Sequence, residues 1–328
     1  METLPPETPE PSTPSAATRF PIFFGPDGLR AGWSVLAYVA ILALLLFGAG
    51  FELRWFAVHT HQKMLGKGAE FQPAFSIVTE ATTLLVVVLA TALMAWFEHR
   101  RVSFYGLAGS DRIRQFFIGL VSGFVFLSLL VGILVATHHL QLERIQMPAA
   151  AIARYAAAWA LFFFLVGMTE EFLLRGYLLF TLARGIRFWP AAFVLAALFG
   201  LLHKSNVGES PFGLASAAMI ALVFSLSLWR LGHLWWAIGF HMAWDWAESF
   251  FYGTADSGTV SAGRLMHAHP MGSLLVSGGA TGPEGSVWVL LIVILASAFV
   301  WTTQPFHGIR LSENDNLRVA DRIQPSER

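Results

Sequence analysis

Three short clusters of ionisable side chains interrupt apolar stretches of this chain. The first contains Glu170, Glu171 and Arg175 within LFFFLVGMTEEFLLRGYLLF. Glu171 and Arg175 are four residues apart, so on a helix they lie one above the other in the order that favours an ion pair. Glu170 points about 100° away from Glu171 and has no such local partner. We therefore predict that Glu171 is a structural acid and that Glu170 can serve as a general base.

The second and third clusters each contain a histidine. Phe199 and His203 end the stretch FWPAAFVLAALFGLLH, and His241 and Asp245 lie within LWWAIGFHMAWDWAESFF. The four-residue spacing puts His241 and Asp245 on one face of a helix. Asp245 either fixes the tautomer of the His241 imidazole, or both side chains face the reacting group together. Glu248 follows one turn later and is interpreted as a residue of the helix end.

A helical hairpin is predicted to bring the first two clusters together. Gly185 is a typical helix stop and Pro190 a typical helix start, so a turn is expected near 186 or 187. Glu170 lies about 16 residues before this turn and His203 about 16 after it. Two antiparallel helices that rise ~1.5 Å per residue carry both side chains to the same depth. A carboxylate and an imidazole at one level can share a water, whereas His241 joins them only if its own turn lies at a different depth.

Ionisable groups inside spanning helices cost several kcal/mol unless they are paired or hydrated, so each is a functional hypothesis. Any one cluster can also be a structural polar network that holds helices together. Three clusters in consecutive apolar stretches favour a shared site. Glu80 is isolated within its apolar stretch and is interpreted as a structural or lipid-interface residue.

The elements that carry these clusters are expected to be membrane-spanning helices. The 328 residues are 55% hydrophobic and 13% charged, with a mean hydropathy of +0.60, which excludes an ordinary soluble protein. The net charge of zero does not indicate nucleic acid as a partner, and the absence of cysteine excludes disulfides and thiolate metal sites. Eight apolar runs approach the length needed to cross a bilayer. They are 31–51, 74–97, 115–137, 151–184, 188–203, 212–230, 233–251 and 287–303.

The order of these runs predicts how the chain is organised. We expect a disordered tail, N-terminal transmembrane helices, a catalytic helical core, an outer loop, and a last transmembrane helix with a cytoplasmic tail. The boundaries are 1–20, 21–150, 151–251, 252–286 and 287–328. With eight spans, alternate connecting segments lie on the same side of the membrane as the N-terminus. Lys and Arg are more frequent in these segments than in the others, so both termini are predicted to be cytoplasmic. His267 and His269 are expected in a solvated loop rather than in a metal site.

In this order, the motifs Glu-Glu-x-x-x-Arg, Phe-x-x-x-His and His-x-x-x-Asp resemble the CPBP family of intramembrane proteases. That family contains the CaaX prenyl endopeptidases and bacteriocin-processing or immunity proteins. The resemblance covers about residues 150 to 251. It implies an all-helical membrane core in which Glu170 and His203 activate a water. It also implies that His241 and the residue at position 245 stabilise the oxyanion.

Asp245 stands where many members of that family have Asn. An ionised carboxylate cannot donate a hydrogen bond, so this residue favours an orienting or a metal-ligating role. If a metal takes part, Glu170, His203, His241 and Asp245 are its expected ligands, and two histidines with carboxylates suit Zn²⁺. The His-Glu-x-x-His motif of other zinc proteases does not occur. The cofactor is therefore expected to be either none or Zn²⁺.

These observations predict an all-α, polytopic transmembrane bundle of about eight helices in the inner membrane of a prokaryotic cell. The resemblance implies an intramembrane endopeptidase that hydrolyses a peptide bond of a membrane-associated protein or peptide. The expected partners are this substrate and the lipid bilayer, with no nucleic acid. Two other functions stay open, namely a non-catalytic membrane scaffold or immunity protein and a proton-coupled transporter.

Overall fold

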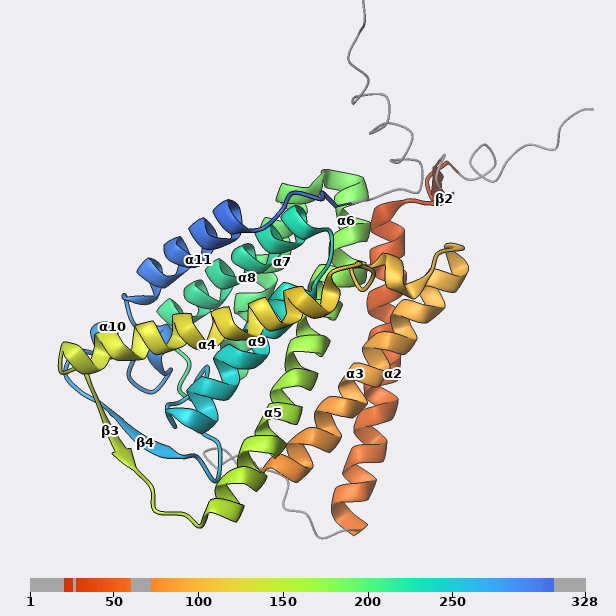
Figure 1. The fold of residues 1–328 in the computed structure, drawn as a ribbon. Helices are drawn as coiled ribbons and strands as arrows, with labels where there is room; N and C mark the ends of the chain where they lie inside the picture. Colours follow the sequence, from red (N-terminus) through yellow and green to blue (C-terminus); the bar gives the residue numbers. More distant parts are fainter. Residues whose placement is uncertain (1–20, 26–27, 60–71, 310–328) are drawn as a thin grey trace, which may run out of the picture.

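The computed structural model describes residues 21–25, 28–59 and 72–309. The predicted disordered tail 1–20 and most of the predicted cytoplasmic tail lie outside the described residues. Within them, helices dominate and the strands are few and short (Figure 1). The prediction of an all-α polytopic bundle of about eight helices is confirmed.

Each of the eight predicted spans is helical. The long elements are α2 (Ala31–His59), α3 (Pro73–Phe97), α4 (Arg112–Ala136), α5 (Ala149–Glu171), α6 (Leu179–Ile186), α7 (Phe188–Leu202), α8 (Pro211–Leu231), α9 (Trp235–Trp246) and α11 (Val289–Thr303). A π-helix, η2 (Phe172–Leu178), joins α5 to α6, and a second, η4 (Ala247–Phe251), extends α9. The predicted span 151–184 is therefore one continuous but irregular element.

Six of these helical segments are long and apolar enough to cross a membrane. They are Ala31–Arg54, Pro73–Phe97, Arg112–Ala136, Ala149–Ile186, Phe188–Ser205 and Pro211–Leu231. Large apolar side chains point outward from them: Leu44, Phe47 and Phe51 of α2 and Trp96 of α3 have exposed fractions between 71% and 80%. Such an outer surface suits contact with lipid.

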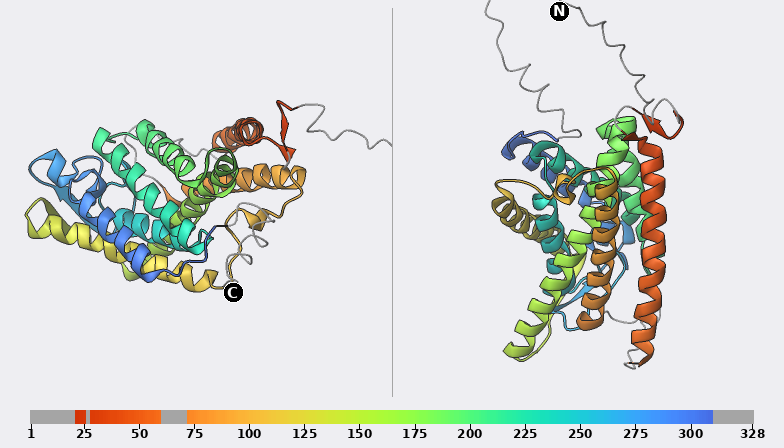
Figure 2. Two further views of the ribbon diagram at one scale, coloured as in Figure 1. Left: turned by 90° about the horizontal axis from the view of Figure 1, so that it is seen from above. Right: turned by 90° about the vertical axis from the view of Figure 1, so that its right-hand side faces the viewer.

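The helices that carry the clusters pack against one another. In two views, α2, α3 and α5 run side by side, and α4 crosses beside α9 (Figures 1 and 2). Gly119 and Gly123 of α4 lie directly against the backbone of α9 at Trp236 and Phe240. This small-residue spacing lets two helix backbones approach closely within a membrane. It fixes α9, which carries the third cluster, against the middle of the bundle.

The hairpin between α6 and α7 turns at a single residue, Arg187, whose φ is +72°. The turn lies where the sequence predicts it. Gly185 is still inside α6, and Pro190 is within the first turn of α7, where proline is tolerated. After α7 a short 3₁₀ turn, η3 (His203–Ser205), begins at the histidine of the second cluster.

The segment 252–286 has structure of its own. It contains β4 (Met266–Pro270), the short helix α10 (Leu274–Ser277) and the 3₁₀ turn η5 (Pro283–Gly285). Strand β4 pairs antiparallel with β3 (Leu140–Arg144), which follows α4. The segment predicted as an outer loop therefore folds back onto the rest of the protein, because its strand β4 is hydrogen-bonded to β3. His267 and His269 are exposed on β4, in a strand rather than a loop.

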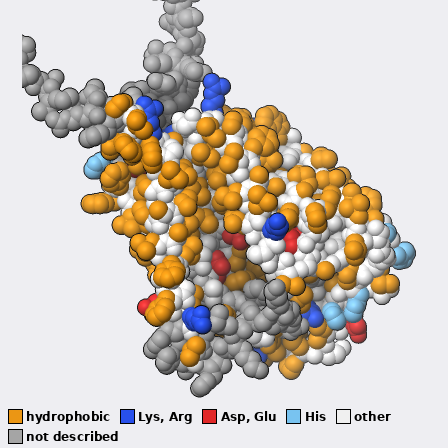
Figure 3. Space-filling model, turned by 180° about the vertical axis from the view of Figure 1, so that it is seen from behind, with side chains coloured by type: hydrophobic (Ala, Val, Ile, Leu, Met, Phe, Trp, Pro, Cys, Tyr) orange, Lys and Arg blue, Asp and Glu red, His pale blue; other side chains and the backbone are white. Residues whose placement is uncertain are grey.

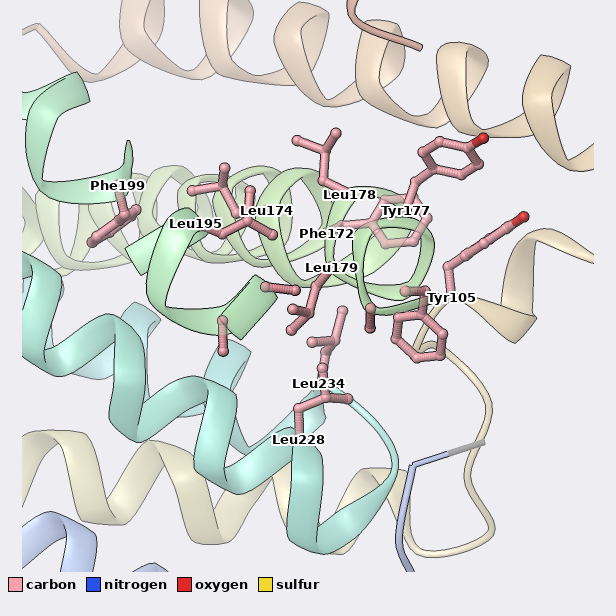
Figure 4. Close-up of a cluster of buried hydrophobic side chains, with 14 of the residues drawn as sticks. Tyr105, Phe172, Leu174, Tyr177, Leu178, Leu179, Leu195, Phe199, Leu228 and Leu234 are labelled. Atoms are coloured by element: carbon pink, nitrogen blue, oxygen red, sulfur yellow. The ribbon is translucent and has the colours of Figure 1, made fainter. Parts of the chain in front are cut away.

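Buried aromatic and aliphatic side chains surround the π-helix η2 (Figure 4). Phe172 and Tyr177 are completely buried, and Leu195 and Phe199 of α7 belong to the same cluster. The backbone of Gly176 departs from helical geometry, with ψ of −117°. π-helical turns are uncommon and occur frequently at functional sites. Here the irregular turn directly follows the glutamate pair.

Candidate active site

A cavity of about 360 Å³ lies between the helices that carry the three clusters. Two histidines and several carboxylates line it together with aromatic side chains. Its ionisable lining residues are Glu80, Glu170, His203, His241, Asp245, Asp256 and Glu284. Figure 3 shows acidic side chains in a hollow of an otherwise largely hydrophobic face. All three sequence clusters thus reach one polar space inside an apolar protein.

Glu171 and Arg175 form a completely buried ion pair. Arg175 NH1 donates to Glu171 Oε1 at 2.9 Å, and the two side chains are 2% and 0% exposed. The Arg175 guanidinium also lies over the Phe199 ring, 4.6 Å from its centre, and over the Phe224 ring at 5.6 Å. These cation–π contacts replace part of the hydration that the guanidinium loses. The pair does not line the cavity itself but packs against Phe199 and Phe224, which do.

His241 is held by this ion pair. Its Nδ1 lies 3.1 Å from Glu171 Oε1, the oxygen that also accepts from Arg175. Because this carboxylate oxygen acts as an acceptor toward Arg175, Nδ1 carries a proton and donates it to the same oxygen. The His241 ring stacks on Phe224 with centres 5.5 Å apart. The orientation of His241 is therefore fixed by Glu171, and its other nitrogen is directed toward the cavity.

Two carboxylates face His241 Nε2 from the cavity side. Glu170 Oε2 lies 3.7 Å and Asp245 Oδ2 3.4 Å from this nitrogen. Both distances are longer than a good hydrogen bond, so the nitrogen is near both oxygens but firmly held by neither. The Glu170 side chain is 33% exposed, whereas that of Asp245 is 11% exposed. Glu170 thus faces the open part of the cavity, and Asp245 lies deeper.

His203 comes to the same cavity from the end of α7. Its Nδ1 lies 2.8 Å from the carbonyl oxygen of Phe199. A carbonyl oxygen only accepts, so Nδ1 carries a proton, and Nε2 of the neutral ring is left as an acceptor. The Phe199 ring packs edge-on against His203, with centres 4.7 Å apart, and against His241 at 6.2 Å. The phenylalanine of the second motif therefore contacts both histidines.

The arrangement does not gather the four expected zinc ligands. Within the described residues, the group of acidic and histidine ligand atoms that lie within 4.8 Å of one another is Glu248, Asp256 and Glu284. Ligands of a tetrahedral zinc ion, with bonds of about 2.0–2.2 Å, lie closer together than this. His241 Nδ1 is bonded to Glu171, and its Nε2 lies 3.4 Å and 3.7 Å from two of the other expected ligands, Asp245 and Glu170. The structure thus does not bring all four expected ligands together as one group, and the expected cofactor, none or Zn²⁺, stays a prediction.

The sequence did not indicate three acidic residues that line the cavity. Glu80 was interpreted as isolated, but α3 packs on α5 and brings Glu80 beside Thr169 and near Glu170. Asp256 and Glu284 come from the segment predicted as an outer loop. A carboxylate in an apolar span was a signal for Glu80. Asp256 and Glu284 carry no such signal in the sequence, and only the position of their folded-back segment shows that they line the cavity.

The fold and the cavity define a polytopic helical membrane protein with an acid and histidine site among its helices. Residues 152–247 match the model of a protein family described as Type II CAAX prenyl endopeptidase Rce1-like. This stretch contains all three motifs, and the family resemblance predicted from them is confirmed. No curated protein and no solved structure matches the chain.

The family match bears on the activity of the chain, and the apolar helices bear on its location. The matched family is described as one of endopeptidases, so residues 152–247 are similar to a hydrolase of peptide bonds. With six segments long and apolar enough to cross a bilayer, it is an integral, multi-pass membrane protein. The predicted prokaryotic inner membrane and cytoplasmic termini remain predictions.

Proposed function

We propose that the chain is an intramembrane endopeptidase that hydrolyses a peptide bond of a membrane-associated protein or peptide, with water activated by Glu170 and His203. The observation that carries this proposal is the meeting of Glu170, His203 and His241 in one cavity enclosed by apolar helices. Peptide hydrolysis needs a base for water, a donor for the developing oxyanion and an acid for the leaving amine. Each of these roles has a candidate side chain in the cavity.

Glu170 is the proposed general base. It is the more exposed of the two carboxylates near His241, and its Oε2 is buried without a hydrogen-bond partner among the described residues. A carboxylate with an uncommitted oxygen can accept the proton of a water placed in the cavity. His203 Nε2, left as an acceptor by the bond of Nδ1 to Phe199, can hold the same water in position.

His241 is the proposed donor to the oxyanion. Its Nδ1 is fixed by Glu171, so the ring presents Nε2 to the cavity, where a proton on this nitrogen can be donated. The oxygens of Glu170 and Asp245 that lie 3.7 Å and 3.4 Å from this nitrogen are both acceptors that a proton on Nε2 would face. Asp245 is assigned as a positioning residue, because its Oδ2 lies 3.4 Å from Nε2 and can accept a hydrogen bond from it.

The chemical steps then follow in order. The water oxygen attacks the carbonyl carbon of the peptide as Glu170 takes one of the water protons. Negative charge develops on the carbonyl oxygen, and His241 donates to it. When the C–N bond breaks, the proton on Glu170 moves to the amine, and Glu170 is again ionised. No step in this sequence requires a metal ion.

The test is cleavage by the purified full-length protein in liposomes. Candidate substrates come from membrane peptides that accumulate in a knockout strain, and a prenylated CaaX peptide serves as a separate probe of the family description. We expect Glu170→Gln and His203→Ala to lower cleavage by at least 100-fold, because general base catalysis contributes about 10²–10⁴-fold. Glu143→Gln, at a carboxylate on β3 whose side chain is 78% exposed, should leave cleavage unchanged.

The two other functions give different results in the same preparation. A proton-coupled transporter would take up a solute into liposomes, and Glu170→Gln would stop this uptake. A scaffold or immunity protein would act by binding, so its effect in cells would be the same with Glu170→Gln as with the unmodified protein. Unchanged cleavage of a true substrate by Glu170→Gln and His203→Ala would contradict the assignment of catalysis to this site.

A further inference from the structure

A second acidic cluster lies beside the proposed active site. Glu248 is in η4 at the end of α9, Asp256 is in the segment that follows, and Glu284 is in η5. One carboxylate oxygen from each of the three lies within 4.8 Å of the others. Asp256 and Glu284 also line the cavity. Two of the three residues are thus part of the cavity wall, and the proposed hydrolysis uses none of the three.

Glu248 is the residue that points to a ligand. It is completely buried, and both of its carboxylate oxygens lack a hydrogen-bond partner among the described residues. The Trp244 side chain lies beside the carboxylate but does not meet hydrogen-bond geometry with it. An ionised carboxylate buried without a partner costs several kcal/mol. This group therefore needs either a proton or a cation.

The other two carboxylates are already oriented by neighbouring donors. The Ser249 hydroxyl donates to Asp256 Oδ2 at 3.0 Å, and the backbone N–H and hydroxyl of Ser257 both donate to Glu284 Oε1 at 3.1 Å. Burial and then the negative charge of Glu284 raise the pKa of Asp256 above its usual range. Acidic groups held this close repel one another unless positive charge lies between them.

The backbone also approaches the cluster. Gly282 has φ of +110°, and a Cβ at this position would lie 3.1 Å from Glu248 Oε1 and would collide with the carbonyl oxygen of Ala255. The absence of a side chain at Gly282 lets the returning segment come close to the Glu248 carboxylate. The Ala255 carbonyl oxygen and Glu248 Oε1 thus both lie beside Gly282, and carbonyl oxygens are also ligands of hard cations.

We propose that Glu248, Asp256 and Glu284 bind a hard divalent cation, Ca²⁺ or Mg²⁺, which holds the segment 252–286 against α9 as a wall of the cavity. Oxygen atoms on opposite sides of a Ca²⁺ ion are about 4.6–5.2 Å apart, given bonds of 2.3–2.6 Å. The spacing of the cluster accommodates such an ion. Because Mg²⁺ demands a near-ideal octahedron and these ligands come from three separate segments, we expect Ca²⁺ to bind more tightly.

The experiment uses the purified full-length protein in detergent, freed of metal ions, and Tb³⁺ as a luminescent substitute for Ca²⁺. Trp244, beside Glu248, provides an indole that can sensitise the luminescence. We expect a saturable signal that CaCl₂ displaces. Glu248→Gln, Asp256→Asn and Glu284→Gln should each weaken Tb³⁺ binding at least tenfold. The exposed-acid variant Glu143→Gln should bind as the unmodified protein does.

A second pair of variants separates this site from the catalytic carboxylates. Glu170→Gln and Asp245→Asn should keep the Tb³⁺ signal. If they abolish it while Glu248→Gln retains it, the ion belongs to the catalytic group and the proposal is wrong. No saturable signal from the unmodified protein would equally overturn it and would leave a proton on Glu248. CaCl₂ should also raise the unfolding temperature of the unmodified protein but not that of a folded Asp256→Asn variant.

These measurements need no substrate. The cation proposal therefore stands or falls separately from the proposed hydrolysis. If Glu248→Gln does not fold, Asp256→Asn and Glu284→Gln carry the test, because both residues are less buried than Glu248.

Discussion

The guanidinium carbon of Arg175 lies 4.6 Å from the centre of the Phe199 ring. This contact joins the first motif to the second, since the same ring packs against His203 and His241. Phe199 is 3% exposed and has no polar group of its own to react. Its contribution is to hold a buried cation and two imidazoles at fixed positions around the cavity.

Phe199→Leu should therefore reduce both stability and cleavage. Leucine keeps most of the apolar volume but loses the cation–π contact, which is worth about 2 kcal/mol when the cation is desolvated. We expect a lower unfolding temperature in detergent and a several-fold lower kcat. Phe193→Leu is the matched control, because Phe193 is on the same helix and 58% exposed. Equal effects of the two substitutions would show that the contact with Arg175 has no special role.

Removal of one partner of the buried ion pair should cost more than removal of both. Arg175→Met leaves Glu171 without its buried cation, and we expect it to destabilise the protein by about 3–5 kcal/mol. The double variant Arg175→Met with Glu171→Gln should recover part of this loss, since no unpaired charge remains. The comparison is made on unfolding temperatures of the single and double variants. A double variant as unstable as Arg175→Met would contradict the ion-pair explanation.

His241 and Asp245 should differ in how much they contribute to catalysis. Loss of one donor to an oxyanion lowers kcat by about 10²–10³-fold, and we expect this of His241→Ala. Asp245→Asn keeps an oxygen that can accept from His241 Nε2, so its kcat should fall by about tenfold or less. Steady-state cleavage in liposomes gives both values. A loss for Asp245→Asn as large as that for His241→Ala would assign Asp245 a direct chemical role.

Stability should depend on pH through Asp111, which precedes α4. Its carboxylate accepts hydrogen bonds from His233 at 2.9 Å and from Gln115 at 3.0 Å, and Arg114 lies 3.8 Å away. Partial burial opposes ionisation, but the hydrogen bonds outweigh it and hold the pKa of Asp111 below its usual range. A lowered pKa contributes stability above the pKa of the unfolded chain, and this contribution is lost as pH falls through the folded pKa.

The advantage of the unmodified protein over Asp111→Asn should accordingly be full at neutral pH and shrink from about pH 4 downward. Unfolding temperatures measured across this range give the difference directly. Glu52→Gln, at an exposed acid of α2, is the control and should show no such trend. A difference that stays constant down to the lowest pH would contradict the assignment.

Zinc should not be required for cleavage. Because the four expected ligands do not all lie within 4.8 Å of one another, we expect 1,10-phenanthroline to leave kcat unchanged and elemental analysis to find less than stoichiometric zinc. EDTA is the informative contrast, since it also removes hard cations such as Ca²⁺. Inhibition by phenanthroline that Zn²⁺ reverses would establish a metal-dependent protease instead.

The spans and the polar clusters were predictable because their signals are local. Apolar runs of spanning length give the helices directly, and the four-residue spacing of Glu171 and Arg175 predicts their contact. The hairpin at Arg187 follows from the nearby glycine and proline. These features depend on short stretches of sequence, and the structure reproduces them closely.

The remaining features depend on how distant segments pack. Nothing near Glu80 in the sequence indicates that α3 lies against α5, and nothing near Asp256 or Glu284 indicates that their segment turns back into the bundle. The π-helices are equally hidden, because their residues have the apolar pattern of an ordinary helix. The sequence thus predicts the chemistry of the site but only some of the residues that line it.

The pairing of β3 with β4 constrains how the protein is made. Leu140 of β3 is opposite Pro270 of β4. The ribosome must therefore add most of the remaining chain before β3 can pair with β4. Helix α9 and the segment that follows it must therefore be inserted before β3 and β4 can pair. A nascent chain released before Met266 would keep β3 as an open edge, which is a site for capture by a chaperone or for aggregation.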